Sequence, residues 1–82
     1  MEITLQSKKL FIDYAKDADN WNGTPLVGGN VGTQSADKGN LTHLKKLGLI
    51  TTEQELDDID TSWVIFTEKG KAYAKELGID LI

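Results

Sequence analysis

The sequence contains no cysteine and no arginine, and it has a single proline and a single histidine among its 82 residues. Without cysteine there is no disulfide framework, zinc ribbon, iron–sulfur cluster or thiol nucleophile, and a reducing compartment such as the cytoplasm is the expected location. The longest apolar run is only the four residues 63–66, and residues 1–10 do not resemble a secretory signal. We therefore expect a cytoplasmic protein with no membrane partner.

The composition that remains suits one small domain over residues 1–82. Hydrophobic residues make up 39% and charged residues 27%, which is typical of a globular protein, and a chain this short forms one modest core without a deep substrate chamber. One histidine and scattered carboxylates offer no catalytic pair, so we expect a protein that is not an enzyme and uses no cofactor. The formal net charge is −4, so nucleic-acid binding would need a local basic surface.

Two segments near the ends of the chain have the pattern of capped amphipathic helices. In residues 5–19 the apolar side chains follow one another at steps of one, three and four, and Thr4 stands at the capping position. Residues 68–77 follow Thr67, a second capping residue, and stop at Gly78. The apolar tail after Gly78 is expected to pack, either on its own domain or on a copy of it. The expected buried stripe of the first helix is Leu10, Phe11, Tyr14, Ala15 and Ala18.

The clearest helix is expected over residues 35–47, with Ser35 as its cap and Gly48 as its stop. Its last turn is basic, which suits the negative end of the helix dipole. Gly39 inside the helix costs about 1 kcal/mol relative to alanine and suggests a close backbone approach. The expected buried ridge is Leu41, Leu44 and Leu47.

Two further segments, 49–52 and 62–67, are rich in β-forming residues, and the polar residues 53–62 between them predict a hairpin loop. The earlier segment 23–32 is rich in glycine; residues 25–27 could form either one helical turn or a short edge strand, and the sequence leaves both open. Alternation divides the apolar side chains of the second strand between two faces. One face has Val64 and Phe66, and the other has Trp63 and Ile65.

The order of these elements resembles the winged helix-turn-helix domain. Residues 40–50, Asn-Leu-Thr-His-Leu-Lys-Lys-Leu-Gly-Leu-Ile, look like the end of a recognition helix that runs into the first wing strand, and residues 64–72 look like the second wing strand running into a closing helix. The resemblance implies a mainly helical α+β fold with three helices and a two- or three-stranded wing, and a recognition helix in the major groove of DNA. The chain departs from the family in two places: the glycine-rich segment 23–32 replaces the usual second helix, and the wing over 53–60 is acidic.

The outward face of the 35–47 helix is the expected DNA-binding surface, although its polar residues could also be a plain solvated face. Lysine pairs with phosphates, and hydroxyl or amide groups can contact base edges, but the lack of arginine removes the fork that makes most guanine contacts. We predict a DNA-binding transcriptional regulator or accessory factor that docks on double-stranded DNA with weak sequence readout, and a homodimer would raise its affinity. The candidate contact residues are Gln34, Ser35, Lys38, Thr42, His43, Lys45 and Lys46.

The acidic loop supports an alternative hypothesis with a protein partner. The same scaffold would then be an acidic protein-interaction module, of which a phage-type inhibitor of a host nucleic-acid enzyme is one form. A calcium site is not expected, because an EF-hand loop starting at Asp58 would place Trp63 where glycine is needed and Lys69 where glutamate is needed. The candidate residues for the protein interface are Glu53, Glu55, Asp57, Asp58, Asp60, Trp63 and Ile65.

Overall fold

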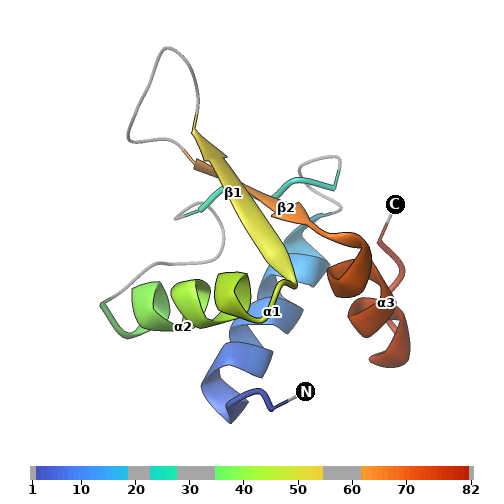
Figure 1. Cartoon of the computed structure of the whole chain (residues 1–82). Helices are drawn as coiled ribbons and strands as arrows, with labels where there is room; N and C mark the ends of the chain where they lie inside the picture. Colours follow the sequence, from blue (N-terminus) through green and yellow to red (C-terminus); the bar gives the residue numbers. More distant parts are fainter. Residues whose placement is uncertain (1, 19–22, 28–34, 55–61, 82) are drawn as a thin grey trace.

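The computed structural model describes residues 2–18, 23–27, 35–54 and 62–81, and for residues 35–38 it describes only the backbone. The described residues form an α+β fold of three helices and a two-stranded antiparallel hairpin, as the sequence predicts. Figure 1 shows the hairpin above the helices, with α1 between α2 and α3. In chain order the elements are α1 (Leu5–Asp17), α2 (Ser35–Lys46), β1 (Ile50–Gln54), β2 (Ser62–Phe66) and α3 (Glu68–Glu76).

Helix α1 begins and packs as its sequence pattern predicts. The Thr4 side chain accepts a hydrogen bond of 3.2 Å from the backbone N–H of Ser7, which satisfies one of the free amides at the start of the helix. The Ser7 hydroxyl lies 3.3 Å from the side-chain oxygen of Asn40 and donates to it, so a polar contact also links α1 to α2. The whole predicted stripe is buried: Leu10, Phe11, Tyr14, Ala15 and Ala18.

The core lies where α1 meets the inner face of the hairpin and the last helix. The ring of Phe11 packs edge-on against Phe66 of β2 at a centroid distance of 5.6 Å, and it contacts Tyr73 of α3 at 5.2 Å. Aromatic pairs at such distances add stabilisation beyond their buried area. Phe11 is completely buried, so one side chain of α1 joins three elements of the fold.

Helix α2 packs its leucines inward. Leu44 is fully buried and Leu41 nearly so, whereas Leu47 is partly buried at the edge of the core. Gly48 has a left-handed φ of 76°, a conformation that glycine adopts without steric cost, and it ends the helix as expected. A capping residue stands just before the first residue of a helix. Ser35 is itself the first residue of α2, so the prediction that Ser35 caps this helix is wrong.

The hairpin has one buried and one outer face. Residues Ile50 and Phe66 face each other across the strands, as do Thr52 and Val64, and their apolar side chains are buried. Strand β1 runs on to Gln54, which is two residues farther than the predicted strand 49–52. Glu53 therefore belongs to the ladder and not to the loop, because its backbone still pairs with β2. The outer face has Thr51, Glu53, Trp63 and Ile65.

A third segment of chain pairs with the free edge of β2. The N–H of Val27 donates to the carbonyl of Ser62 at 2.9 Å, and the N–H of Val64 donates to the carbonyl of Pro25 at 2.8 Å. Leu26 thereby forms an antiparallel bridge with Trp63. Residues 25–27 thus form an isolated β-bridge at the edge of β2, which is close to the edge-strand alternative, and they do not form a helical turn, because their backbone groups bond to Ser62 and Val64. Residues 28–32 of the glycine-rich segment lie outside the described residues.

Helix α3 closes the fold. It is capped by Thr67, as predicted, and it ends before Gly78, whose φ is 80°. Ile79 and Leu81 of the tail pack against the core, so the tail covers its own domain. Over the described residues, no helix has the length and apolar character that a bilayer span requires.

Candidate nucleic-acid interface

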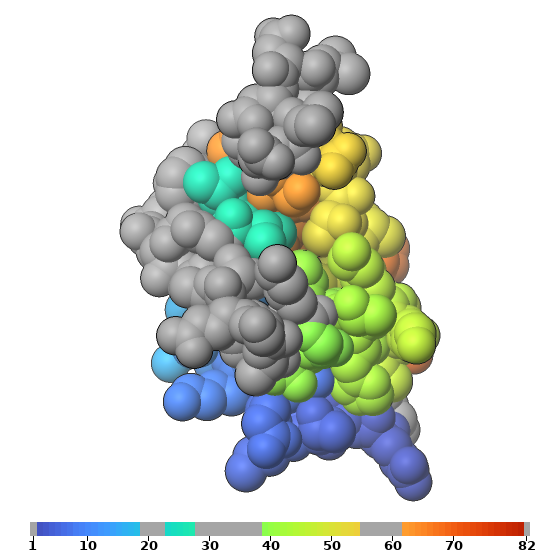
Figure 2. All heavy atoms as spheres, turned by 90° about the vertical axis from the view of Figure 1, so that its left-hand side faces the viewer, coloured from blue at the N-terminus to red at the C-terminus, as the bar shows by residue number. Residues whose placement is uncertain are grey.

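The solvent-facing side of α2 contains three of the predicted DNA contacts. Because Leu41 and Leu44 point into the core, the periodicity of the helix sends Thr42, Lys45 and Lys46 to the other side, and all three are exposed. Figure 2 shows α2 (green) at the surface next to β1 (yellow). We call this surface the α2 face, and it consists of Gly39, Thr42, Lys45 and Lys46.

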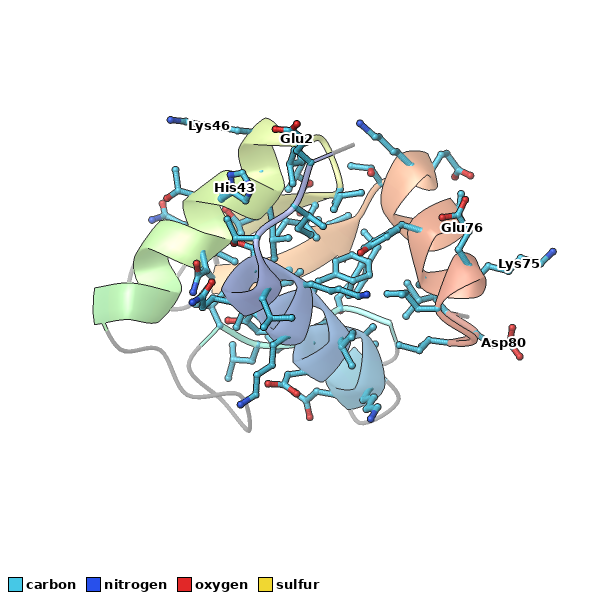
Figure 3. All side chains as sticks on the ribbon, turned by 90° about the horizontal axis from the view of Figure 1, so that it is seen from below. Glu2, His43, Lys46, Lys75, Glu76 and Asp80 are labelled. Carbon is cyan, nitrogen blue, oxygen red and sulfur yellow. The ribbon has the colours of Figure 1, made fainter. Side chains whose placement is uncertain are left out.

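The two lysines of the α2 face form no ion pair with a described residue. Lys71 differs, since its ammonium group lies 3.6 Å from the Glu68 carboxylate one turn away on α3. Lys46 extends away from the body of the protein, as Figure 3 shows. The positive charges of Lys45 and Lys46 are therefore available to an anion from outside.

His43 lies at the border of this surface and is partly buried. Its Nε2 atom is shielded from solvent and has no hydrogen-bond partner among the described residues. A ring nitrogen in that position is not presented to the groove of a nucleic acid. Among the predicted contacts with described side chains, His43 is thus the one that the fold turns partly inward.

The other predicted contacts lie at the start of the helix, where little is described. Ser35 and Lys38 lie one turn apart on the backbone of α2, but their side chains are not among the described ones. Gln34 lies outside the described residues.

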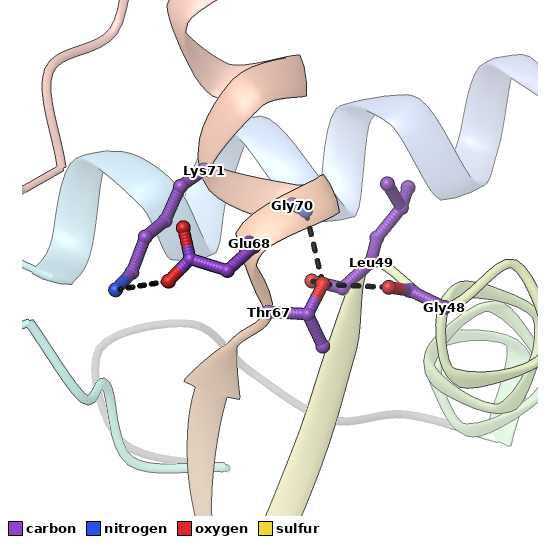
Figure 4. A network of polar contacts seen from close by, with 6 residues as sticks. All are labelled: Gly48, Leu49, Thr67, Glu68, Gly70 and Lys71. Atoms are coloured by element: carbon purple, nitrogen blue, oxygen red, sulfur yellow. Dashed lines mark hydrogen bonds and ion pairs between the residues drawn. The ribbon is translucent and has the colours of Figure 1, made fainter.

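The end of α2 is held by a network of polar contacts with the start of α3 (Figure 4). The Thr67 hydroxyl donates to the carbonyl of Gly48 at 2.6 Å and lies 3.0 Å from that of Leu49, while its oxygen accepts the N–H of Gly70 at 3.0 Å. Gly70 itself is needed, because a Cβ at this position would overlap the carbonyl oxygen of Leu49. One threonine therefore caps α3 and satisfies a free carbonyl after α2 at the same time.

Lys69 was not singled out by the sequence, yet it takes part in the same junction. Its ammonium group donates to the carbonyl of Leu47 at 2.9 Å, 22 residues away in sequence. A cation at the C-terminal end of a helix is favourable because the free carbonyls there have a partial negative charge. No local pattern could reveal this contact, since it depends on how α3 docks against α2.

Comparison with known proteins gave no significant match. No family model, no curated protein and no solved structure matches this chain.

The acidic surface of the alternative hypothesis is described only in part. Glu53 is exposed and stands opposite Trp63 in the ladder, and Ile65 lies on the same outer face, where both apolar side chains are partly buried. In the described part of the chain, no three His, Asp or Glu side chains are grouped as a metal ion would need. The remaining candidates lie outside the described residues: Glu55, Asp57, Asp58 and Asp60.

Proposed function

We propose that this chain is a non-enzymatic DNA-binding protein that docks the α2 face on double-stranded DNA. The observation that carries the proposal is that Lys45 and Lys46 are exposed and form no ion pair with any described residue. An ammonium group without an internal partner can neutralise a phosphate, and the release of counterions from the DNA then drives binding. At about 0.1 M salt the screening length is about 10 Å, so the repulsion between DNA and the more distant carboxylates of this chain of net charge −4 is weakened at the α2 face.

The layout of the chain supports a winged-helix interpretation. Helix α2 is followed directly by an antiparallel hairpin and then by a closing helix, and residues 25–27 extend the hairpin by a third segment. In that interpretation α2 is the recognition helix and the hairpin is the wing. The junction at Thr67 supports it too, since it holds the end of α2 against the closing helix.

The position of the lysines favours contacts with phosphates over contacts with bases. Recognition helices generally read base edges with their N-terminal residues, whereas Lys45 and Lys46 are in the last turn of α2. Lysine acts on phosphate as a point charge, and the chain has no arginine for bidentate recognition of guanine. We therefore propose binding that depends little on sequence, as in an accessory factor of transcription.

The acidic end of the hairpin restricts how DNA would lie. Glu53 is exposed near the far end of β1, while the lysines are before its start, so the two charges are at opposite ends of the strand. Phosphates would be repelled from the end with Glu53. The bound duplex would accordingly follow α2 and stay away from the tip of the hairpin.

The test is a charge reversal at the proposed site with a control elsewhere. In Lys45→Glu/Lys46→Glu, we expect the affinity for a fluorescein-labelled 20-base-pair duplex to fall at least tenfold in an anisotropy titration at low salt. The matched control is Lys16→Glu/Lys75→Glu, because these lysines are also exposed and also lie in the last turns of helices. Both double variants lower the net charge by the same amount and place the new carboxylates in last turns of helices, two on α2 in the first variant and one each on α1 and α3 in the control.

The outcomes are distinct. The control variant should retain most of the affinity, since its lysines are on α1 and α3. Equal losses in both variants would mean that only net charge matters, and unchanged binding in the first variant would refute a role for the α2 face. Circular dichroism of each variant verifies that the fold is intact.

The outer face of the hairpin supports a second candidate function, a protein-interaction module. A charged and an aromatic residue, Glu53 and Trp63, face each other in the ladder there, and tryptophan often anchors protein interfaces. A partner captured from cell extract that survives nuclease treatment and is lost in Glu53→Lys would favour this function. Under the DNA-binding proposal, nuclease treatment should release whatever is captured.

A further inference from the structure

Four of the five glycines at described positions are explained by the fold itself. Gly23, Gly48 and Gly78 have left-handed φ values of 92°, 76° and 80°, which other residues adopt with strain. Gly70 has a helical backbone, but any side chain there would overlap the carbonyl of Leu49. Each of these positions needs glycine for a reason that lies within the chain.

Gly39 has no such reason among the described residues. It lies inside α2 with ordinary helical geometry, it is exposed, and a Cβ built on it would meet no described atom within 4 Å. Glycine is among the least favourable residues in a helix interior, because it loses the most backbone entropy on folding. Alanine would fit the described part of the fold at least as well, so no described contact accounts for the glycine.

We propose that Gly39 is the point where α2 lies closest to bound DNA, with its bare backbone against the sugar–phosphate chain. This inference rests on the proposed function. Gly39, Thr42 and Lys46 follow one another at steps of three and four residues, so they share one side of the helix. The glycine is therefore part of the same exposed face as a lysine that forms no ion pair with a described residue.

The missing side chain changes how near a surface can approach. Side chains extend a helix from a Cα radius of about 2.3 Å to an outer radius of about 5 to 6 Å, so a surface can come roughly 3 Å closer at a glycine. Lys46 lies seven residues farther on, which is about 10 Å along the axis. Its long flexible side chain can reach a neighbouring phosphate while the backbone at Gly39 contacts the duplex directly. The glycine and the lysine then act at two separate points of one binding surface.

The test separates stability from binding, because the two should change in opposite directions. In Gly39→Ala we expect the melting temperature to rise by about 4 °C, since alanine favours the helix. The affinity for the labelled 20-base-pair duplex should nevertheless fall about fivefold, and Gly39→Leu should lower it further. A matched control is Ala72→Leu, which adds an apolar side chain at an exposed position of α3 and should leave binding unchanged.

Failure of this inference can be told apart from failure of the proposed function. If both Gly39 variants bind as tightly as the natural chain while Lys45→Glu/Lys46→Glu loses binding, the close approach at Gly39 is wrong and the DNA-binding function stands. If neither set of variants changes the affinity, or the natural chain has none, both are wrong. A parallel loss of melting temperature and affinity in Gly39→Ala would also overturn the inference, because the glycine would then serve the fold.

Discussion

The side-chain hydroxyl of Thr67 donates a hydrogen bond of 2.6 Å to the carbonyl oxygen of Gly48. These two residues belong to the ends of different helices, since Thr67 caps α3 and Gly48 ends α2. Their contact holds the C-terminal end of α2 against the start of α3. The proposed DNA-binding lysines, Lys45 and Lys46, are in the last turn of α2. The orientation of the α2 face therefore depends on a residue that is itself not part of that face.

Replacing Thr67 should destabilise the fold, although it removes no side chain of the α2 face. We expect Thr67→Ala to lower the free energy of unfolding by about 1 to 2 kcal/mol, because both the helix cap and the bond to Gly48 are lost. Urea denaturation monitored by circular dichroism measures the change. Thr67→Ser keeps the hydroxyl and should stay close to the natural stability; an equal loss in both variants would show that the methyl group, and not the hydrogen bonds, is responsible.

Alanine should have opposite effects at two helix glycines. Gly70→Ala should lower the free energy of unfolding by about 1 to 3 kcal/mol, because the added Cβ overlaps the backbone carbonyl of Leu49 and forces α3 away. Gly39→Ala should raise it by up to about 1 kcal/mol. Both substitutions add the same single carbon, so denaturation curves of the two variants compare directly. A stabilised Gly70→Ala would contradict the close packing of α3 on Leu49, the residue before β1.

Phe11 should be the most sensitive single position of the core. Phe11→Ala removes the ring that packs on both Phe66 and Tyr73, and such a deletion costs about 3 to 5 kcal/mol. Small domains have a total stability of about 5 to 15 kcal/mol, so this variant should be largely unfolded near 37 °C. Thermal denaturation followed by circular dichroism checks this. Ile12→Ala on the neighbouring, less buried position of α1 serves as the control and should cost far less.

Salt should weaken DNA binding in proportion to the number of lysines involved. Two phosphate contacts predict that the logarithm of the association constant falls with the logarithm of the salt concentration with a slope of about −2. Lys45→Gln should reduce the magnitude of the slope by about one, because one phosphate contact is lost. Anisotropy titrations between 50 and 200 mM salt, roughly the range over which such losses are large, provide the slope. A slope unaffected by Lys45→Gln would remove this lysine from the interface.

Local patterns were sufficient for the elements that depend on neighbours in the chain. The apolar steps in α1 predicted its buried stripe, and the capping residues Thr4 and Thr67 predicted where α1 and α3 begin. The stop at Gly48 was equally clear. These features follow from the repeat of the helix and from backbone groups that need partners within three residues, so a short stretch of sequence contains the necessary information.

Predictions were incomplete wherever a partner lay far away in sequence. Residues 25–27 form a β-bridge because their backbone bonds to the edge of β2, and β1 continues through Glu53 because this residue pairs with Trp63 of β2. His43 was a candidate DNA contact, but packing shields its Nε2 atom. Hydrogen-bond partners and burial at these positions are set by the docking of elements, which a one-dimensional pattern does not describe.

The amino-acid sequence by itself determined which residues could serve a nucleic-acid surface: lysines in the last turn of one helix, and no arginine anywhere. Only the tertiary structure decided which of them face outward without a partner, since Lys69 is bound to the carbonyl of Leu47 whereas Lys45 and Lys46 form no ion pair with a described residue. It also decided that a Cβ at Gly70 would overlap the carbonyl of Leu49, whereas a Cβ at Gly39 would meet no described atom. The physical reason is that charge and helix propensity are properties of residues, while exposure and steric room exist only once distant segments have packed together.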